Sequence, residues 1–343
     1  MAVTLKDVAD AAGVSIKTVS NVVNGYSFVK EDNRRRVEAA LVATGYRPNI
    51  GARNLRRGTT GFLALVVPEL GIPYFGELAS CVITAARERG WNVLIEQTQG
   101  ERDRERASLD ALGPHFVDGA IVSPEALLAE DFATLSPDFP LVLLGEHDVD
   151  LPVDQPVDHV GIDNVAAART AVEHLVALGR QRIAVIGDNP RRGTAALRLR
   201  GYRAALEAAG QPVREGYVQP ADSYHRLDGA EGMARLLALP EPPDAVFCFN
   251  DLLAIGALRA LAEAGLRVPD DVAVVGFDGS DESAFSLPAL TTIDPDKAAI
   301  ARAAVDLIGR PGSRAPRPGG ARPVRQDVEV PFTLVERAST SGR

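Results

Sequence analysis

The sequence has few of the features that mark secreted, membrane or disulfide-rich proteins. Only two of its 343 residues are cysteines, and this pair, Cys81 and Cys248, provides no disulfide framework and fits a reducing compartment. No run approaches the ~18 consecutive apolar residues of a transmembrane helix. Asp7 and Asp10 interrupt the N-terminal segment where a signal peptide needs an apolar core. We therefore expect a cytoplasmic protein with no membrane partner.

Signatures of common enzymes and metal sites are also missing. The chain contains no P-loop, no G-x-G-x-x-G fingerprint and no G-x-S-x-G nucleophile motif. Its histidines follow no HExxH or other metal-ligand spacing, so each is expected to be structural or on the surface. These histidines are His115, His147, His159, His174 and His225. We therefore expect neither an enzyme nor a metal or cofactor site.

Charge is unevenly distributed along the chain. The net charge of −9 by itself argues against a nucleic-acid partner. However, residues 1–60 hold 10 Lys and Arg against 5 Asp and Glu, a local charge of +5, and the remaining residues, with 27 against 41, carry −14. Chance clustering could produce this pattern. A basic head on an acidic body is also typical of a DNA-binding module joined to another domain.

The basic head, residues 1–47, has the pattern of three short helices. Thr4 can cap a helix that ends at Gly13, and Ser15 can cap a second helix that ends at Asn24. A third helix is expected over about residues 30–45. Two short helices joined by a tight turn that contains glycine form a helix-turn-helix. A plain three-helix bundle that binds nothing would show the same periodicity.

Three segments of the head, TLKDVADAAGVSIKTVSNVVNG, VKEDNRRRV and GYRPNIGARNL, resemble in this order the N-terminus of the LacI/GalR family of bacterial repressors. The resemblance implies that the second helix is the recognition helix in the major groove. Many members carry arginine where this chain has Asn21, and asparagine favours adenine over guanine. The resemblance assigns base readout to Ile16, Lys17 and Asn21. The full set of residues that it assigns to DNA in and around this helix is Ser15, Ile16, Lys17, Thr18, Asn21 and Asn24.

The segment 48–60 follows the head. Asn49 can cap a short helix that contains Ala52 and Leu55, but so short a helix is unstable alone, and a flexible linker fits equally well. The family resemblance implies a hinge helix that folds when two copies pack in the minor groove of a palindromic operator. Asn49, Ala52 and Leu55 then contact the DNA, and Leu55 is the apolar wedge that kinks it.

From residue 61 to residue 337, short apolar runs alternate with helical segments. This alternation predicts an α/β fold with a doubly wound parallel sheet, and its repetition after an interruption at LPVDQPV predicts two lobes. The motifs PYFGEL, GIDN, LRLRGY, FCFNDLLAIGAL, VPDDVAVVGFD and LTTID extend the resemblance over this region. It implies a periplasmic-binding-protein-like fold in which the chain crosses between the lobes three times. Residues 309–323 are expected to form a mobile loop, and VEVPFTLVERAS a final strand.

An effector cleft is expected between the lobes, beyond the C-terminal ends of the strands. A carboxylate at a strand end can instead cap the next helix, and we expect this of Asp251. An arginine and an aspartate can clamp the hydroxyls of a sugar, the expected effector, or the edge of a purine. The residues assigned to the effector are Tyr74, Phe75, Arg198, Tyr224, Asn250 and Asp278. For Phe75, a role in the hydrophobic core stays open as the alternative.

The sequence therefore predicts a homodimeric repressor that binds double-stranded operator DNA and responds to a small molecule. No leucine heptads support a larger oligomer, and the helix around Leu78, Val82 and Ala85 is expected to contribute to the dimer interface. A solute-binding protein of the same fold is the alternative, which would need an export signal and no DNA-binding head. The sequence does not identify the effector, or say whether it induces or co-represses.

Overall fold

The computed structural model describes residues 3–24, 26–46, 59–113, 116–132, 136, 139–145, 157–189, 193–310 and 325–341. The chain divides into two compact units, Met1–Thr60 and Gly61–Arg343. No helix among the described residues is long and apolar enough to cross a membrane.

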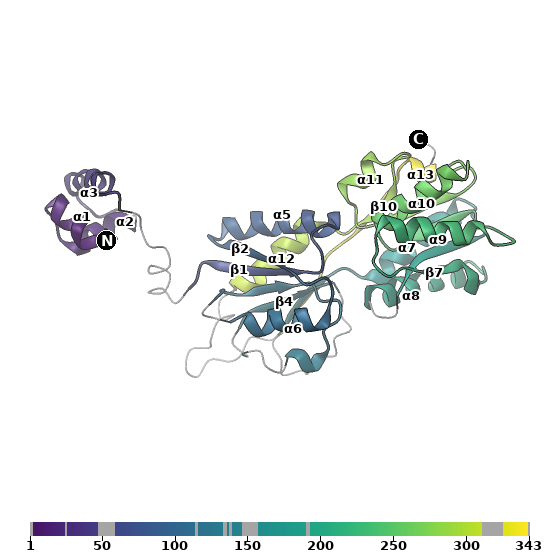
Figure 1. The fold of residues 1–343 in the computed structure, drawn as a ribbon, viewed down its shortest axis with the longest axis horizontal. Helices are drawn as coiled ribbons and strands as arrows, with labels where there is room; N and C mark the ends of the chain where they lie inside the picture. Colours follow the sequence, from purple (N-terminus) through teal and green to yellow (C-terminus); the bar gives the residue numbers. More distant parts are fainter. Residues whose placement is uncertain are drawn as a thin grey trace. The chain divides into compact units, whose positions relative to one another are not determined.

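The first unit contains the three helices that the sequence predicts, α1 (Leu5–Ala12), α2 (Ile16–Val23) and α3 (Glu31–Thr44) (Figure 1). Local hydrogen bonds explain where the first two begin. The Thr4 hydroxyl accepts a hydrogen bond from the Asp7 amide, and the Asp7 carboxylate accepts one from the Thr4 amide. Together these two bonds form a capping box. The Ser15 hydroxyl caps α2 by accepting from the Thr18 amide at 3.1 Å. Gly13 ends α1 in the left-handed conformation, with φ of 62°.

The first lobe of the second unit is a parallel sheet in the order β11-β5-β4-β3-β1-β2. Helices α5 and α12 cover one face, and α6 covers the other (Figure 1). Side chains that alternate along β1 therefore enter two separate cores. The elements are β1 (Phe62–Val67), α5 (Pro73–Glu88), β2 (Asn92–Gln97), α6 (Arg102–Ala111), β3 (Ala120–Val122), η1 (Ala129–Phe132), β4 (Leu141–Leu144), β5 (Asp158–Gly161), α12 (Lys297–Gly309) and β11 (Asp327–Glu329).

The second lobe repeats this architecture with the strand order β12-β10-β9-β8-β6-β7, in which only the edge strand β12 is antiparallel to its neighbour within the described residues. The pair α7 and α8 and the pair α9 and α10 pack on the sheet. The elements are α7 (Asn164–Ala177), β6 (Ile183–Asp188), α8 (Gly193–Ala208), η2 (Glu215–Tyr217), β7 (Val218–Pro220), α9 (Arg226–Leu237), β8 (Ala245–Cys248), α10 (Asp251–Glu263), β9 (Ala273–Phe277), α11 (Asp281–Phe285), β10 (Thr291–Asp294), β12 (Thr333–Val335) and α13 (Ala338–Ser341).

The chain passes between the lobes after β5, after β10 and after β11. These crossings confirm the predicted fold class, a helical head followed by a two-lobed, doubly wound α/β domain. The prediction of one final strand was wrong, because β11 joins the first sheet and β12 the second. Pro331 lies between them and has no amide hydrogen for a sheet ladder.

Two further expectations need correction. The second unit continues beyond residue 337, since Ser339 in α13 is buried and its hydroxyl accepts from the Thr291 amide at 2.8 Å. Leu78, Val82 and Ala85 cannot form a dimer surface, because all three are at most 8% exposed and pack in the core of the first lobe. Their periodicity reflects the inner face of α5.

Candidate functional site: a recognition helix and an interlobe cleft

Helix α2 presents a mixed apolar and polar face to solvent. Ile16 is 49% exposed. Lys17 is exposed and Asn21 half-buried, and neither side chain is hydrogen-bonded to any residue that the structure describes. The three residues expected to read bases therefore have side chains available for an external partner.

The other residues assigned to DNA on α2 have local partners. Ser15 caps the helix, and its hydroxyl lies 2.9 Å from that of Thr18. The Asn24 side-chain amide donates to the Ser20 carbonyl at 2.7 Å, one turn back along the helix. These three side chains thus shape the ends of α2, and any contact that they make with DNA would be additional to that role.

Two arginines of α3 hold the fold of the head. Arg36 donates to the Gly13 carbonyl in the turn between α1 and α2, at 3.0 Å, and Arg34 donates to the Tyr26 carbonyl at 2.8 Å. These bonds fix the turn and the loop that flank α2. The hinge residues Asn49, Ala52 and Leu55 lie outside the described residues, so their assignment to DNA stays a prediction.

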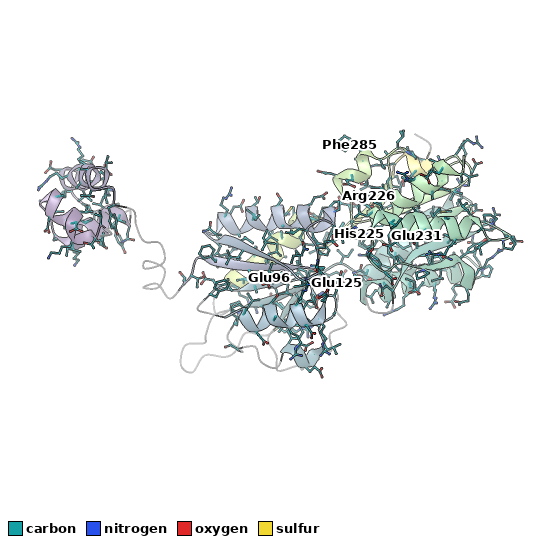
Figure 2. The ribbon with its side chains drawn as sticks, viewed as in Figure 1. Glu96, Glu125, His225, Arg226, Glu231 and Phe285 are labelled. Carbon is teal, nitrogen blue, oxygen red and sulfur yellow. The ribbon has the colours of Figure 1, made fainter. Side chains whose placement is uncertain are left out.

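A cavity of about 100 Å³ lies where the two lobes meet, and the crossing segments after β5 and β10 contribute to its wall. Figure 2 shows Glu125 and His225 on the facing sides of the two lobes. The cavity is lined by all six residues assigned to an effector, which are Tyr74, Phe75, Arg198, Tyr224, Asn250 and Asp278.

Asp278 is the carboxylate that the second lobe presents to this cavity. It follows β9 directly and is 8% exposed. Its φ of 114° lies in a region that residues other than glycine rarely adopt, and its amide donates to the Ile293 carbonyl at 2.9 Å. No described residue donates a hydrogen bond to its carboxylate. Burial raises the pKa of Asp278 to about 8, against the opposing effect of the Arg198 charge.

Arg198, on α8, is held by three partners. Its Nε donates to the Asn164 side chain at 3.0 Å, and its guanidinium lies 3.6 Å from the centroid of the Phe277 ring. It also donates to the Phe249 carbonyl. The guanidinium is therefore oriented before any ligand binds. Asn164 lines the same cavity and was missed by the sequence reasoning, although the GIDN motif contains it.

Asn250 and Tyr224 support the wall of the cavity. The Asn250 side chain caps α10 by accepting from the Leu253 amide at 2.8 Å, and it donates to the Tyr224 carbonyl at 3.0 Å. The expectation that Asp251 caps this helix was wrong. Its buried carboxylate instead accepts from Ser280 and Thr292 on neighbouring segments, and burial raises its pKa to about 6.

The first lobe contributes the aromatic part of the cavity. The rings of Tyr74 and Phe75 meet edge to face, with centroids 5.2 Å apart. Both side chains are half-buried and also pack against the core of their lobe, so Phe75 combines the two roles that the sequence left open. Glu125, beyond β3, lines the cavity as well and was missed; the strand-end rule that pointed to Asp278 would have found it.

Comparison with known proteins identifies the family. Residues 4–49 match the model described as "Bacterial regulatory proteins, lacI family", and residues 172–340 match "Periplasmic binding protein-like domain". The ribose operon repressor of Escherichia coli (strain K12) is 33% identical over 311 residues, which cover 89% of this chain and 92% of that protein. This chain belongs to the lacI family of bacterial regulatory proteins.

Solved structures of transcriptional regulators extend the match to both units. The lac repressor dimer bound to operator and an anti-inducer is 29% identical and covers 99% of each chain with a TM-score of 0.84. The complex of the regulator CelR with cellobiose is 32% identical, with a TM-score of 0.67, and covers 98% of this chain and 99% of that one. As a lacI-family member with the matching head, this protein is a DNA-binding transcriptional regulator, and the alternative of a solute-binding protein without a regulatory role is not supported.

The raised pKa of Asp278 predicts a pH dependence of stability. An aspartate in an unfolded chain titrates near ~3.9, so between that pH and about 8 the folded protein keeps a proton that the unfolded chain has lost. The free energy of unfolding must therefore fall as pH rises through this window, by at most about 1.4 kcal/mol per pH unit. Asp278→Asn cannot titrate, so its melting temperature should fall less between pH 6 and pH 8. Equal slopes in both proteins would contradict the assignment, and Asp188→Asn, at the end of β6, is the control.

Proposed function

We propose that this protein is a repressor that binds a palindromic operator as a homodimer and is controlled by a small carbohydrate in the interlobe cleft. The observation that carries the proposal is the cavity itself. An oriented arginine, a buried carboxylate that accepts no hydrogen bond from the described residues, and an aromatic pair converge there from both lobes.

The chemistry of the cavity favours a polyhydroxylated ring. Asp278 keeps its proton below about pH 8 in the empty cleft, but hydroxyls that donate to it would favour the ionised form. The ionised carboxylate can then accept from two vicinal hydroxyls while the Arg198 guanidinium donates to a third oxygen. The Tyr74 and Phe75 rings supply an apolar surface for the C–H face of a sugar. Relatives support this class: one represses the ribose operon, and CelR was solved with cellobiose. A purine is the second candidate, because the same arginine and aspartate can pair with a base edge.

The test is a thermal-shift screen with a panel of monosaccharides, disaccharides and purine bases. A ligand that binds the native state raises the melting temperature, by an amount that grows with its concentration. Electrophoretic mobility shifts on operator and random DNA, with salt titrated, test the DNA-binding half, since affinity should fall steeply as salt rises. A sugar that stabilises the protein and changes operator affinity would support the whole proposal. Stabilisation by purines alone would overturn its carbohydrate part.

We also propose that the protein has no catalytic activity and acts in the cytoplasm, where its DNA target lies. This fits a cleft in which the polar groups orient one another and whose described lining residues include no histidine to act as a base. Groups of three or more potential metal ligands are likewise absent from this part of the chain. We propose no cofactor beyond the effector.

The dimer surface that we propose includes the exposed end of α11. Phe285 is 89% exposed and Leu287 is 95% exposed, and Phe285 lies at the periphery of the second lobe in Figure 2. Adjacent large apolar side chains at this exposure suit a second copy of the chain. The double variant Phe285→Asp, Leu287→Asp should sediment as a monomer at micromolar concentration. Leu227→Asp, on α9 and 69% exposed in the native protein, should remain dimeric; a dimeric double variant would place the interface elsewhere.

A further inference from the structure

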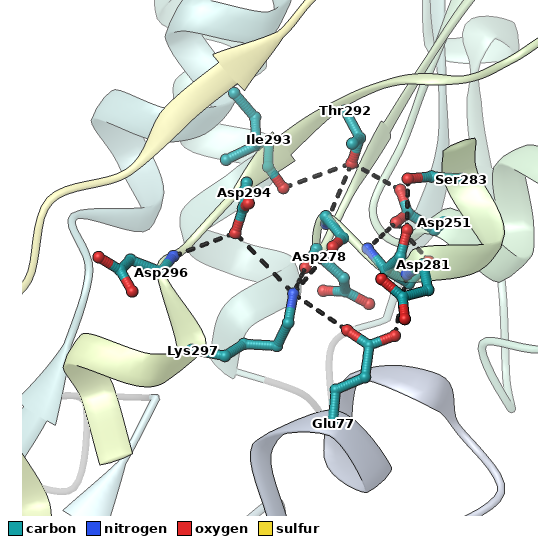
Figure 3. Close-up of polar contacts among 12 residues, drawn as sticks. Glu77, Asp251, Asp278, Asp281, Ser283, Thr292, Ile293, Asp294, Asp296 and Lys297 are labelled. Atoms are coloured by element: carbon teal, nitrogen blue, oxygen red, sulfur yellow. Dashed lines mark hydrogen bonds and ion pairs between the residues drawn. The ribbon is translucent and has the colours of Figure 1, made fainter. Parts of the chain in front are cut away.

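A cluster of buried polar groups joins the two lobes beside the cleft (Figure 3). Its centre is Lys297, the first residue of α12, which belongs to the first lobe. The ammonium donates to the carbonyls of Asp278 and Gly279 in the second lobe, at 2.7 Å and 2.9 Å. It also lies 3.3 Å from the Glu77 carboxylate and 3.8 Å from that of Asp294. The Lys297 side chain is only 10% exposed, so these groups replace the water that a lysine normally keeps.

Glu77, on α5 of the first lobe, binds the same segment of the second lobe, residues 278–281. One of its carboxylate oxygens faces Lys297, and the other accepts from the Asp281 amide, the first residue of α11, at 2.9 Å. The two ends of the segment 278–281 are therefore both held by side chains of the other lobe. Figure 3 shows Asp278 and Asp281 beside the pair that Lys297 and Glu77 form.

The segment held in this way is the one that presents Asp278 to the cavity. The φ of 114° at Asp278 is costly for an aspartate and persists only where the surroundings impose it. The hydrogen bond from Lys297 holds the carbonyl of this same residue. Neither Lys297 nor Glu77 lines the cavity. Both hold the loop that presents Asp278, and the Lys297 ammonium also lies 5.9 Å from the centroid of the Tyr74 ring, which does line it.

We propose that Lys297 and Glu77 are positioning residues that clamp the 278–281 loop of the second lobe to the first lobe. The clamp sets the direction of the Asp278 carboxylate and couples it to the closure of the cleft. A change in the angle between the lobes must then move Asp278, and a ligand held by Asp278 must favour the lobe arrangement in which the clamp is closed. The regulatory meaning of this coupling rests on the function proposed for the cleft, but the clamp itself can be tested without DNA or effector.

The test is hydrogen–deuterium exchange, by mass spectrometry, of the full-length protein without ligand. Lys297→Met keeps the apolar stem and removes the ammonium, and Glu77→Ala removes the acceptor for the Asp281 amide. Each should speed exchange in the peptide over 278–285 by about tenfold, the effect of losing one hydrogen bond. Glu77→Gln retains an acceptor oxygen and should restore slow exchange at Asp281. Peptides from the middle of α5 and α12 should be unchanged in all three variants.

A matched control uses the other end of the same helix pair. Arg89, which follows α5, pairs with Asp306 of α12 inside the first lobe and away from the cleft. Arg89→Met should leave the 278–285 peptide at the native rate. Unchanged exchange in both Lys297→Met and Glu77→Ala would overturn the clamp, and so would faster exchange spread over the whole first lobe, which indicates a structural role only. If Lys297→Met fails to fold, the comparison of Glu77→Ala with Glu77→Gln decides.

The coupling of the lobes has its own measurement. Spin labels at Glu96→Cys on β2 and Glu231→Cys on α9, in a Cys81→Ser background and diluted with unlabelled chains, report the distance between the lobes. The distance distribution should broaden in Lys297→Met and stay narrow in Arg89→Met. An unchanged distribution in Lys297→Met would show that the clamp does not restrain the lobes, whatever the identity of the effector.

Discussion

Asp278→Asn should abolish most of the response to the effector while operator binding without effector stays within about twofold of the native protein. Asparagine has the same shape and tolerates positive φ, so the local backbone at 114° should survive. In the complex we expect an ionised Asp278, since hydroxyls that donate to the carboxylate favour its charged form. Asparagine offers one acceptor atom where that carboxylate offers two, and the loss of a charge-assisted hydrogen bond weakens binding by about 10- to 100-fold. Because an effector shifts the equilibrium only through differential contacts, the change in operator affinity should shrink with it.

Reporter expression with the ligand titrated, together with mobility shifts on purified protein, measures both halves of this prediction. Asp188→Asn removes a carboxylate from another strand end of the same lobe and should respond normally. Arg198→Ala should also abolish the response, but it leaves the Phe249 carbonyl and Asn164 without their partner, so a change in its basal operator binding would indicate misfolding. A normal response by Asp278→Asn would show that the effector does not bind through this carboxylate, and the assignment of the cavity would be wrong.

Leu55→Ala should weaken operator binding by about 10- to 100-fold and leave binding to random DNA nearly unchanged. The family resemblance places Leu55 as the wedge that unstacks a central base step, and kinking is what specific binding adds to nonspecific binding. Leu55 lies outside the described residues, so this assignment rests on the family pattern. Mobility shifts on operator and random DNA at one salt concentration provide the measurement.

Arg53→Ala is the matched comparison for the hinge, because the family resemblance places Arg53, which also lies outside the described residues, among the phosphates. An arginine among phosphates contributes to every DNA sequence alike, so this variant should lose affinity for operator and random DNA by similar factors and should lower the salt dependence. If Leu55→Ala showed the same uniform loss, the wedge assignment would be wrong, and the segment would act as a basic linker.

The helices of the head could be predicted from sequence because their determinants are local. Thr4 and Asp7 form the capping box that their spacing of three residues predicts, and Ser15 caps α2. Such bonds join residues within one turn of helix, so they depend little on the remainder of the fold. The family match then located the six residues that meet in the cavity, which spacing alone could not bring together.

Errors arose where the environment of a residue depends on distant segments. The apolar stripe of α5 that suggested a dimer surface is buried by α12, more than 200 residues later in the chain. Asp251 looked like a helix cap, but Asn250 takes that role, and Ser280 and Thr292 donate to the aspartate. The last apolar segment looked like one strand and is shared between two sheets.

By itself, the sequence determined the two-part organisation, the alternation of strands and helices, the ends of the head helices and the family. Periodicity, charge and capping act over a few residues and are visible in order along the chain. The tertiary structure alone decided that Lys297 and Glu77 hold the loop that presents Asp278, and that Asn164 orients Arg198. Those contacts exist because the chain crosses between the lobes repeatedly, and crossing places side chains from remote segments within hydrogen-bond distance of one another.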